Sequence, residues 1–460
     1  MRASFALLLA VQGGQLQSWM FGPFAKPTQV NPVITPNPAV SWEAYATFNP
    51  AAIVKDGKIF LLYRAEDASG VQQIGGHTSR LGLAESADGL HFTRRATPVL
   101  YPDTDTQRQY EWPGGVEDPR VVESEDGRYV LTYTQWNRDV PRLAVATSRD
   151  LTSWTKHGPA FARVGGQYMR TESKSGAILS RIQGDRLIAT RVNGKYWMYF
   201  GVPDLRIATS ENLLDWTPLE DSSGEAVKVL SARPGYFDSW LVEAGPPALL
   251  TGRGILVMYN AGSLPSRTYS AGQALFDVRD PTRLIARSDS AFIKPTESYE
   301  RTGQYTAGTT FVEGLVPFRD RWYLYYGTAD SRVGVAVWDP QGQSPAAAIV
   351  GTWHGTSLCV DKQVDRACQD EEVVYLIDSA AGPRGPVRWQ ADKIVNGARE
   401  LMGVLPLTYD STGHHWFVDI NTRFRGRWTL AVRGDSIVGD LSELPARRLV
   451  RRIAAGRIAR

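Results

Sequence analysis

Apolar and polar residues alternate along most of the chain in short stretches that end at turn residues, which is typical of β-strands. From Phe48 a longer pattern recurs: an apolar strand, a turn, a second strand that ends in aromatic residues, a third strand and a short polar segment. The copies occupy residues 48–95, 117–158, 173–218, 242–290 and 311–340.

Two of these units end in the same phrase, ATS-x-[DN]-L-x-x-W, at 146–154 and 208–216. A unit of about four strands cannot bury both of its faces alone, so several units must pack together. Radial packing leaves only short edges. We therefore predict an all-β chain with a five-bladed β-propeller over 19–340. A β-sandwich is the alternative, but its strands would not repeat a closing phrase.

The pattern changes after Gln341. Residues 341–350 are expected to be a linker, and 351–460 contain about seven short alternating strands with tight turns. A small antiparallel β-barrel of the lipocalin type would remove the edges of such a meander. The barrel could cover an edge of the propeller, help the protein to dimerise or bind a small apolar ligand. The basic C-terminal segment 445–460 alternates with apolar residues, which favours a solvated last strand.

Two features bear on the compartment. Residues 1–18 contain Arg2 and a short apolar run, which resembles a weak signal or leader segment. Cys359 and Cys368, nine positions apart, could close a hairpin as a disulfide. Together they favour a periplasmic or secreted protein, with a cytoplasmic protein carrying two free thiols as the alternative.

Composition excludes several classes of partner. The chain carries 51 Lys and Arg against 48 Asp and Glu, so no strong charge favours nucleic acid. No run of 18 apolar residues predicts a membrane span. No Cys/His spacing predicts a metal site, and no glycine-rich phosphate loop predicts a nucleotide. We expect neither metal nor cofactor. The oligomeric state is open.

The first strand of each propeller blade lines the central channel, so polar residues at its start converge. Here those residues are Asn49, Asp118, Lys174, Glu243 and Glu313. Grouped carboxylates suit glycoside cleavage, in which one acid protonates the leaving oxygen and one base activates water. Alternatively, Asp118 and Glu313 cap strands or pair with arginine.

The sequence GGVEDPR at 114–120 favours the catalytic interpretation. Gly114 and Gly115 would allow a ligand close to the backbone, and Pro119 would fix the orientation of Asp118. Trp112 offers a flat face to a sugar ring, or simply packs.

The motifs FNPAAIV, LYRAED, GGVEDPR, PRLAVATS, SKSGAIL, VEAGPP and YYGTADS occur in one order over residues 42–340. In this the chain resembles glycoside hydrolase family 130, the β-mannoside phosphorylases and β-mannosidases. The resemblance implies that Asp118 is the general acid and acts through the mannose 3-hydroxyl. It also implies that Asn49, Arg64 and Asp330 bind mannose. Further substrate contacts in related motifs are Asp67, Arg80 and Arg142.

The chain departs from the family's phosphorylases at Glu243, where they tend to carry a small residue. Glu243 and Glu313 would repel phosphate and could activate water, so we expect an inverting β-mannosidase acting on β-1,2- or β-1,4-linked mannosides. Lys174 and Arg142 could instead hold phosphate, which keeps a phosphorylase as the alternative. A non-catalytic propeller that binds carbohydrate through Trp112 and Tyr110 is a second alternative.

Overall fold

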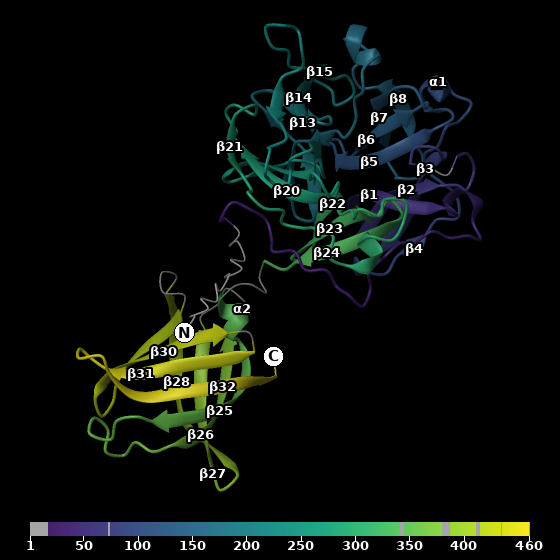
Figure 1. The fold of residues 1–460 in the computed structure, drawn as a ribbon. Helices are drawn as coiled ribbons and strands as arrows, with labels where there is room; N and C mark the ends of the chain where they lie inside the picture. Colours follow the sequence, from purple (N-terminus) through teal and green to yellow (C-terminus); the bar gives the residue numbers. More distant parts are fainter. Residues whose placement is uncertain are drawn as a thin grey trace, which may run out of the picture. The chain divides into compact units, whose positions relative to one another are not determined.

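The computed structural model describes residues 17–71, 74–340, 345–379, 387–410, 415–433 and 435–459. The chain divides into two compact units between Trp338 and Asp339. Nearly all regular structure in both units is β-strand, so the predicted all-β class is confirmed (Figure 1). Most of the predicted leader, residues 1–18, lies outside the described residues, as do 341–344 of the predicted linker.

The strands of the first unit follow one another in five groups, called meanders below, and most neighbours within a group pair antiparallel. In the third group, the hairpin at residues 180–189 instead pairs in parallel with strands of the second and fourth groups. The first contains β1 (Ala46–Lys55), β2 (Lys58–Glu66), β3 (Ser79–Ser86) and β4 (Thr93–Arg94). The second contains β5 (Gly115–Glu123), β6 (Tyr129–Trp136), β7 (Pro141–Ser148) and β8 (Thr155–Pro159). The third contains β9 (Ala177–Ile178), β10 (Ser180–Gln183), β11 (Arg186–Ala189), β12 (Arg191–Val192), β13 (Lys195–Phe200), β14 (Leu205–Ser210), β15 (Thr217–Pro218) and β16 (Lys228–Leu230).

The fourth meander contains β17 (Leu241–Ala244), β18 (Leu249–Thr251), β19 (Gly254–Gly262), β20 (Tyr269–Phe276) and β21 (Leu284–Arg287). The fifth contains β22 (Phe311–Phe318), β23 (Arg321–Thr328) and β24 (Arg332–Trp338). The helices of this unit are short: η1 (Ser41–Glu43), α1 (Arg108–Glu111), η2 (Gly166–Met169) and η3 (Ser298–Glu300). Every residue of the first strands β5, β17 and β22 is buried, including the charged residues that they carry, such as Asp118, Arg120, Glu243 and Glu313.

The repeated closing phrase forms the same turn in both copies. In the second meander the Ser148 hydroxyl accepts the backbone N–H of Leu151, whose φ is 71°, and the Trp154 indole donates to the carbonyl of Leu151. In the third, the Trp216 indole donates to the carbonyl of Leu213, whose φ is 68°. The phrase recurs because its serine hydroxyl and its tryptophan indole each form a hydrogen bond with the backbone of the leucine, and these bonds stabilise the left-handed turn.

The N-terminal segment ties itself to the end of this unit. Ala25 and Ile34 form antiparallel bridges to β24, and the Asn31 side chain both accepts from and donates to the backbone of Val335. Because this segment then continues into β1, it links the last meander with the first.

The second unit is a closed barrel of eight strands in consecutive order. They are β25 (Gly351–Cys359), β26 (Glu371–Ser379), β27 (Val387–Val395), β28 (Ala398–Asp410), β29 (His415–Asn421), β30 (Arg425–Arg433), β31 (Ser436–Glu443) and β32 (Arg448–Ala459). The predicted antiparallel barrel is confirmed, with one strand more than expected. Helix α2 (Pro345–Ile349) occupies part of the segment expected to be a plain linker.

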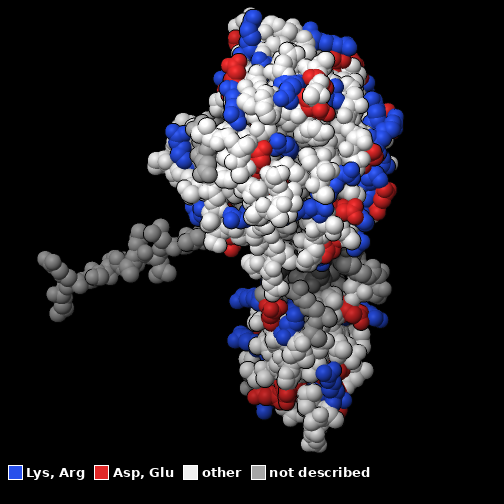
Figure 2. Space-filling view, turned by 90° about the vertical axis from the view of Figure 1, so that its right-hand side faces the viewer, with Lys and Arg blue, Asp and Glu red and all other residues white. Residues whose placement is uncertain are grey.

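Cys359 and Cys368 are joined by a disulfide in the structure. It links the end of β25 to the loop that leads into β26. Across the described part of the chain, no helix is long and apolar enough to cross a membrane. Figure 2 shows basic and acidic side chains interspersed on the face in view, in keeping with the balanced charge of the sequence.

Candidate active site

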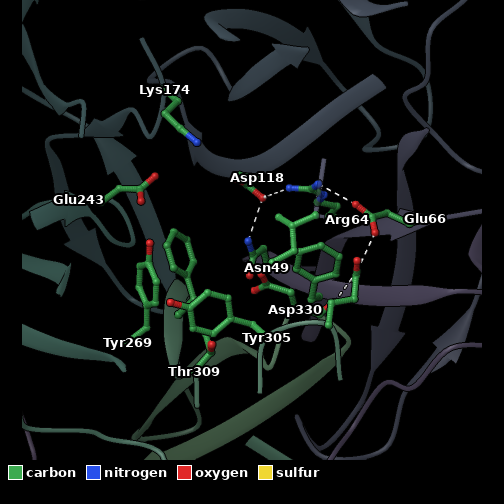
Figure 3. Close-up of a pocket in the computed structure, with 14 residues that line it drawn as sticks. Asn49, Arg64, Glu66, Asp118, Lys174, Glu243, Tyr269, Tyr305, Thr309 and Asp330 are labelled. Atoms are coloured by element: carbon green, nitrogen blue, oxygen red, sulfur yellow. Dashed lines mark hydrogen bonds and ion pairs between the residues drawn. The ribbon is translucent and has the colours of Figure 1, made fainter. Parts of the chain in front are cut away.

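A cavity of about 180 Å³ lies in the first unit, where residues from several meanders meet (Figure 3). It is lined by Phe48, Asn49, Arg64, Glu66, Ile74, Asp118, Lys174, Glu243, Tyr269, Gln304, Tyr305, Thr309, Phe311 and Asp330. Six of the residues singled out in the sequence are among them: Asn49, Arg64, Asp118, Lys174, Glu243 and Asp330.

Several of these residues sit on strained backbone. Asn49, Asp118 and Asp330 have φ of 45°, 49° and 49°, in the left-handed region that non-glycine residues rarely adopt. Asn49 and Asp118 lie at breaks in the register of their strands, each directly before a proline that cannot donate to the ladder. The bulges turn these polar side chains out of the regular alternation, and such strain is typical of functional sites.

Asp118 is held by two donors. Asn49 Nδ2 donates to its Oδ1 at 2.9 Å and Arg64 Nη1 donates to the same oxygen at 3.1 Å. Burial by itself would raise the pKa of Asp118, but Arg64, Lys174 and the hydrogen bond from Asn49 lower it below its ordinary value. Asp118 is therefore a carboxylate in the unliganded pocket.

Arg64 organises the acidic side of the cavity. Its Nη2 lies 2.7 Å from Glu66 Oε1 and 2.9 Å from Glu117 Oε1, and its guanidinium covers the ring of Phe48. Glu117, which precedes Asp118, is buried, and this raises its pKa to about 7 despite Arg64. One cation thus serves three carboxylates, so protons are held in this cluster near neutral pH.

Glu243 and Lys174 lie on the side of the cavity opposite Arg64 (Figure 3). The Ser175 hydroxyl donates a short hydrogen bond to Glu243 Oε1. Burial raises the pKa of Glu243, although Lys174 and Arg120 act in the other direction. The pKa of Lys174 is itself raised, because the attraction of Glu243, Asp118 and Glu117 outweighs its burial. Lys174 therefore stays charged beside Glu243.

Asp330 completes the acidic lining. Burial raises its pKa to about 7, with Arg64 opposing the rise and Asp118 adding to it. The Gln304 amide donates to the Asp330 carbonyl and to Glu66 Oε2, both at 2.8 Å, so it fixes the loop before β22 against the first meander. Asp330 can therefore exchange a proton near neutral pH at the wall of the cavity.

Glu313 does not line the cavity. It is fully buried in β22 and its Oε1 lies 2.7 Å from Arg120 Nη1. Burial raises its pKa well above the ordinary value, although Arg120 opposes the rise, and the charges of Asp118 and Glu243 add to it. Glu313 is thus electrostatically coupled to the cavity without contributing to its surface.

Four further candidates lie outside the lining. Asp67 and Arg80 form an ion pair of 2.6 Å with each other. Arg142 donates to the carbonyls of Met169 and Val140. Trp112 is 48% exposed, and the guanidinium that covers it belongs to Arg108.

The two glycines of GGVEDPR serve packing in the structure. A Cβ at Gly115 would overlap the backbone of Ser79, and one at Gly114 would overlap Trp136. We expected these glycines to admit a ligand. The observed close approach is between neighbouring strands, because Gly115 bridges Ser79 of β3.

The aromatic wall of the cavity was not predicted. It consists of Tyr269 and Tyr305, which meet edge to face with ring centres 5.4 Å apart, together with Phe48 and Phe311. Phe48 could have been found, because it adjoins Asn49 in FNPAAIV. Tyr305 lies in an irregular loop before β22, where the sequence carries no periodicity.

Acidic side chains outnumber basic ones in the cavity lining. Four carboxylic acids line it, Glu66, Asp118, Glu243 and Asp330, against the two cations Arg64 and Lys174. Within the described residues no group of three or more His, Cys, Asp or Glu is arranged to hold a metal ion. The carboxyl groups of the lining can transfer protons to and from a ligand, which is the chemistry that glycoside cleavage needs.

A family model described as beta-1,4-mannooligosaccharide phosphorylase, of glycoside hydrolase family 130, matches residues 26–341. The chain belongs to glycoside hydrolase family 130. The resemblance predicted from the seven motifs is thereby confirmed. The match ends where the first unit ends, so the barrel lies beyond the family domain.

Family 130 relatives with named activities include a 1,2-beta-oligomannan phosphorylase and a beta-1,2-mannobiose phosphorylase, both from Thermoanaerobacter sp. (strain X514). They are 32% and 30% identical, and each match covers 66% of this chain and 94% of the relative. The chain is thus an enzyme of a family that acts on mannosides.

Solved structures of higher identity also match the first unit. A glycosyl hydrolase from Bacteroides ovatus is 52% identical, with a TM-score of 0.69, over 71% of this chain and 96% of that one. Another solved structure is 51% identical, with a TM-score of 0.70, over 71% of this chain and 96% of that one. It comes from work reporting that the GH130 family of mannoside phosphorylases contains glycoside hydrolases that target beta-1,2 mannosidic linkages in Candida mannan.

Proposed function

We propose that the cavity releases mannose from β-1,2-linked manno-oligosaccharides by hydrolysis with inversion. The observation that carries the proposal is Glu243, a buried carboxyl group that lines the same cavity as Asp118. In an inverting reaction one carboxyl group protonates the leaving oxygen and the other activates a water on the opposite face of the sugar. Asp118 takes the first role and Glu243 the second.

The charge of the cavity favours water over phosphate as the acceptor. A phosphate dianion would enter beside Glu243 and Asp118 with Lys174 as the cation that faces them. Repulsion between like charges at short range amounts to several kcal/mol at the effective dielectric of a protein interior, about 20. A neutral water molecule avoids this repulsion and can donate a proton to Glu243.

The acid role of Asp118 requires a proton, whereas its lowered pKa favours the carboxylate. A bound sugar ring would exclude water and raise the pKa of Asp118 from this lowered value, as burial does for carboxyl groups. The pKa of about 7 at Glu117 and Asp330 means that neighbouring groups hold protons at neutral pH. We propose that a proton reaches Asp118 from this cluster when the sugar binds.

The base role of Glu243 depends on its neighbours in the same way. Lys174 favours the charged form of Glu243, and the Ser175 hydroxyl orients the oxygen that it contacts. Glu313, which does not reach the cavity, would act indirectly by holding Arg120. The base is therefore assigned to Glu243.

A β-mannoside phosphorylase is the second candidate. The named activities of the curated relatives and the description of the family model favour it. Lys174 is the cavity residue on which a phosphate would depend, since Arg64 is engaged by three carboxyl groups.

Proton NMR of the first turnovers tests the proposed reaction. With a β-1,2-linked mannotriose in phosphate-free buffer, we expect α-mannose as the first anomer to appear, ahead of mutarotation. A β-1,4-linked mannotriose is the control for linkage. Release of β-mannose first would exclude inversion, and absence of any mannose from either substrate would contradict hydrolysis.

Two wider proposals accompany this one. We propose that the five meanders are the blades of a propeller, because their first strands supply Asn49, Asp118 and Glu243 to one cavity. We also propose that the protein works outside the cytoplasm, which the Cys359–Cys368 disulfide supports.

A further inference from the structure

The C-terminal barrel is filled at one end. Helix α2 lies at the start of β25, and Ile349 of this helix is fully buried. The Trp353 indole, also fully buried, donates to the Ile349 carbonyl at 2.9 Å. These residues join one apolar cluster with buried residues of the other strands, so this end is core.

Toward the other end the barrel is hollow. A cavity of about 240 Å³ is lined by residues such as Ser357, near the end of β25, and Glu371, at the start of β26. The strand ends and loops around it belong to the described part of the chain. Because ligand pockets are commonly about 300–1,000 Å³, this cavity suits a ligand of one or two rings.

The cavity adjoins a seam between β28 and β29. These strands pair at three positions only, from Thr408↔Phe417 to Asp410↔His415, whereas β29 and β30 pair along six. Beyond the paired positions, Gly403 on β28 and Ile420 on β29 line the cavity. We infer that a ligand enters along this unpaired stretch.

One wall of the cavity is polar and its charges are balanced. Arg451 Nη2 lies 2.7 Å from Glu371 Oε2, and Arg451 Nε donates to Ser357 Oγ at 3.0 Å. These residues come from the neighbouring strands β32, β26 and β25. Since Glu371 already neutralises Arg451, the wall offers hydrogen bonds without a net charge for an ionic ligand.

The facing wall is aromatic and aliphatic. Trp389 and Trp428 meet edge to face with ring centres 5.5 Å apart, and Met402 and Ile420 continue the surface. Trp389 Nε1 has no hydrogen-bond partner among the described residues. A ligand that fits both walls has an apolar face to lie on the indole rings and uncharged hydroxyls along its edge.

We propose that this cavity binds a sugar ring, and that it is a second site for the manno-oligosaccharides on which the first unit acts. The identity of the sugar rests on the proposed function. The inference that the barrel holds a ligand site does not. A fatty acid would bring a carboxylate beside the already neutralised Arg451, and a purely apolar ligand would bury Arg451, Glu371 and Ser357 without hydrogen bonds.

The test uses the full chain carrying Asp118→Asn, to prevent turnover, and calorimetric titration with a β-1,2-linked mannotriose. Gly403 lines the cavity, and a Cβ there meets nothing within 4 Å, so we expect Gly403→Phe to fill the cavity. Gly456→Phe is the matched control: a Cβ there also meets nothing within 4 Å, and Gly456 is exposed on β32.

We expect two binding events, of which Gly403→Phe removes one and Gly456→Phe removes none. Gly403→Phe in the otherwise natural chain should leave mannotriose hydrolysis unchanged within about twofold. A single event that Gly403→Phe leaves intact would overturn the proposal. A second contradicting result would be that 1-anilinonaphthalene-8-sulfonate binds the cavity, shown by fluorescence that Gly403→Phe removes, while no sugar binds there.

Failure of the two proposals is distinguishable. If the first unit does not hydrolyse mannosides but the barrel binds them, the event that Gly403→Phe removes will persist in an Asp330→Ala variant. If the barrel proposal fails alone, hydrolysis persists and the remaining event depends on Asp330.

Discussion

The Arg120 guanidinium lies 2.7 Å from the Glu313 carboxylate, and both side chains are buried. The same guanidinium donates to the carbonyl of Asp118 at 3.0 Å and to the carbonyl of Ala244 at 2.8 Å. Arg120 therefore joins the backbone of the proposed acid to that of the residue after the proposed base, Glu243. Arg120 is buried and does not line the cavity, so we class it as a positioning residue.

Replacing Arg120 by Met should destabilise the protein by about 3–5 kcal/mol, because it removes the buried partner of the Glu313 carboxyl group. Urea unfolding measures the loss. The double variant Arg120→Met with Glu313→Leu should recover part of it, since no buried carboxyl group is then left without its partner.

A positioning role also predicts an effect on turnover. Well below the melting temperature, Arg120→Lys should lower kcat more than it raises KM, because lysine cannot reach both carbonyls at once. A change confined to stability, with kcat intact, would show that Arg120 is structural only.

Asp118→Asn should lower kcat by roughly 10²–10⁴-fold, the usual contribution of a positioned proton donor. The amide preserves the shape and the contact with Arg64, so sugar binding should persist in a calorimetric titration. Unchanged turnover would remove Asp118 from the mechanism.

Glu243→Gln should abolish hydrolysis to a similar extent, because an amide cannot accept the proton from water. Ser175→Ala is the matched variant. It removes the hydrogen bond that favours the charged form of Glu243, so the rise of kcat with pH should move to higher pH. A pH profile that Ser175→Ala leaves unchanged would argue against Glu243 as the base.

Asp330→Asn should stabilise the fold at pH 8 and have little effect at pH 4. Folding raises the pKa of Asp330 from 3.8 to about 7, so between these values the folded state holds a proton that the unfolded chain has lost. The stability of the natural protein therefore falls as the pH rises through this window, by up to about 4 kcal/mol for this group. The variant lacks this titration.

Urea unfolding at both pH values measures the effect of Asp330→Asn. An equal effect at pH 4 and pH 8 would mean that the pKa of Asp330 is not raised in the folded protein.

The strand pattern and the repeated phrases were sufficient to predict the all-β class, the C-terminal barrel and several residues of the cavity lining. Asn49, Asp118, Lys174 and Glu243 were found because their positions recur at equivalent points of the repeat. The bulges at Asn49 and Asp118 follow from the prolines after them, a signal that could be read from the sequence.

Other parts of the site depend on tertiary contacts. Glu313 occupies the same position in its strand as Glu243 does in β17. It pairs with the buried Arg120 and does not line the cavity. Trp112 was chosen as an aromatic beside GGVEDPR, whereas the aromatic wall comes from Tyr269 and Tyr305, whose meeting depends on the approach of a loop to β20. Neither pairing has a local signature in the sequence.

The acceptor of the mannosyl group is the central question, and product analysis with and without phosphate answers it most directly. The natural chain is incubated with a β-1,2-linked mannotriose in buffer free of phosphate and in the same buffer with added phosphate. We predict free mannose at equal rates in both. Mannose 1-phosphate that forms only when phosphate is added, with no mannose in its absence, would contradict hydrolysis and establish phosphorolysis.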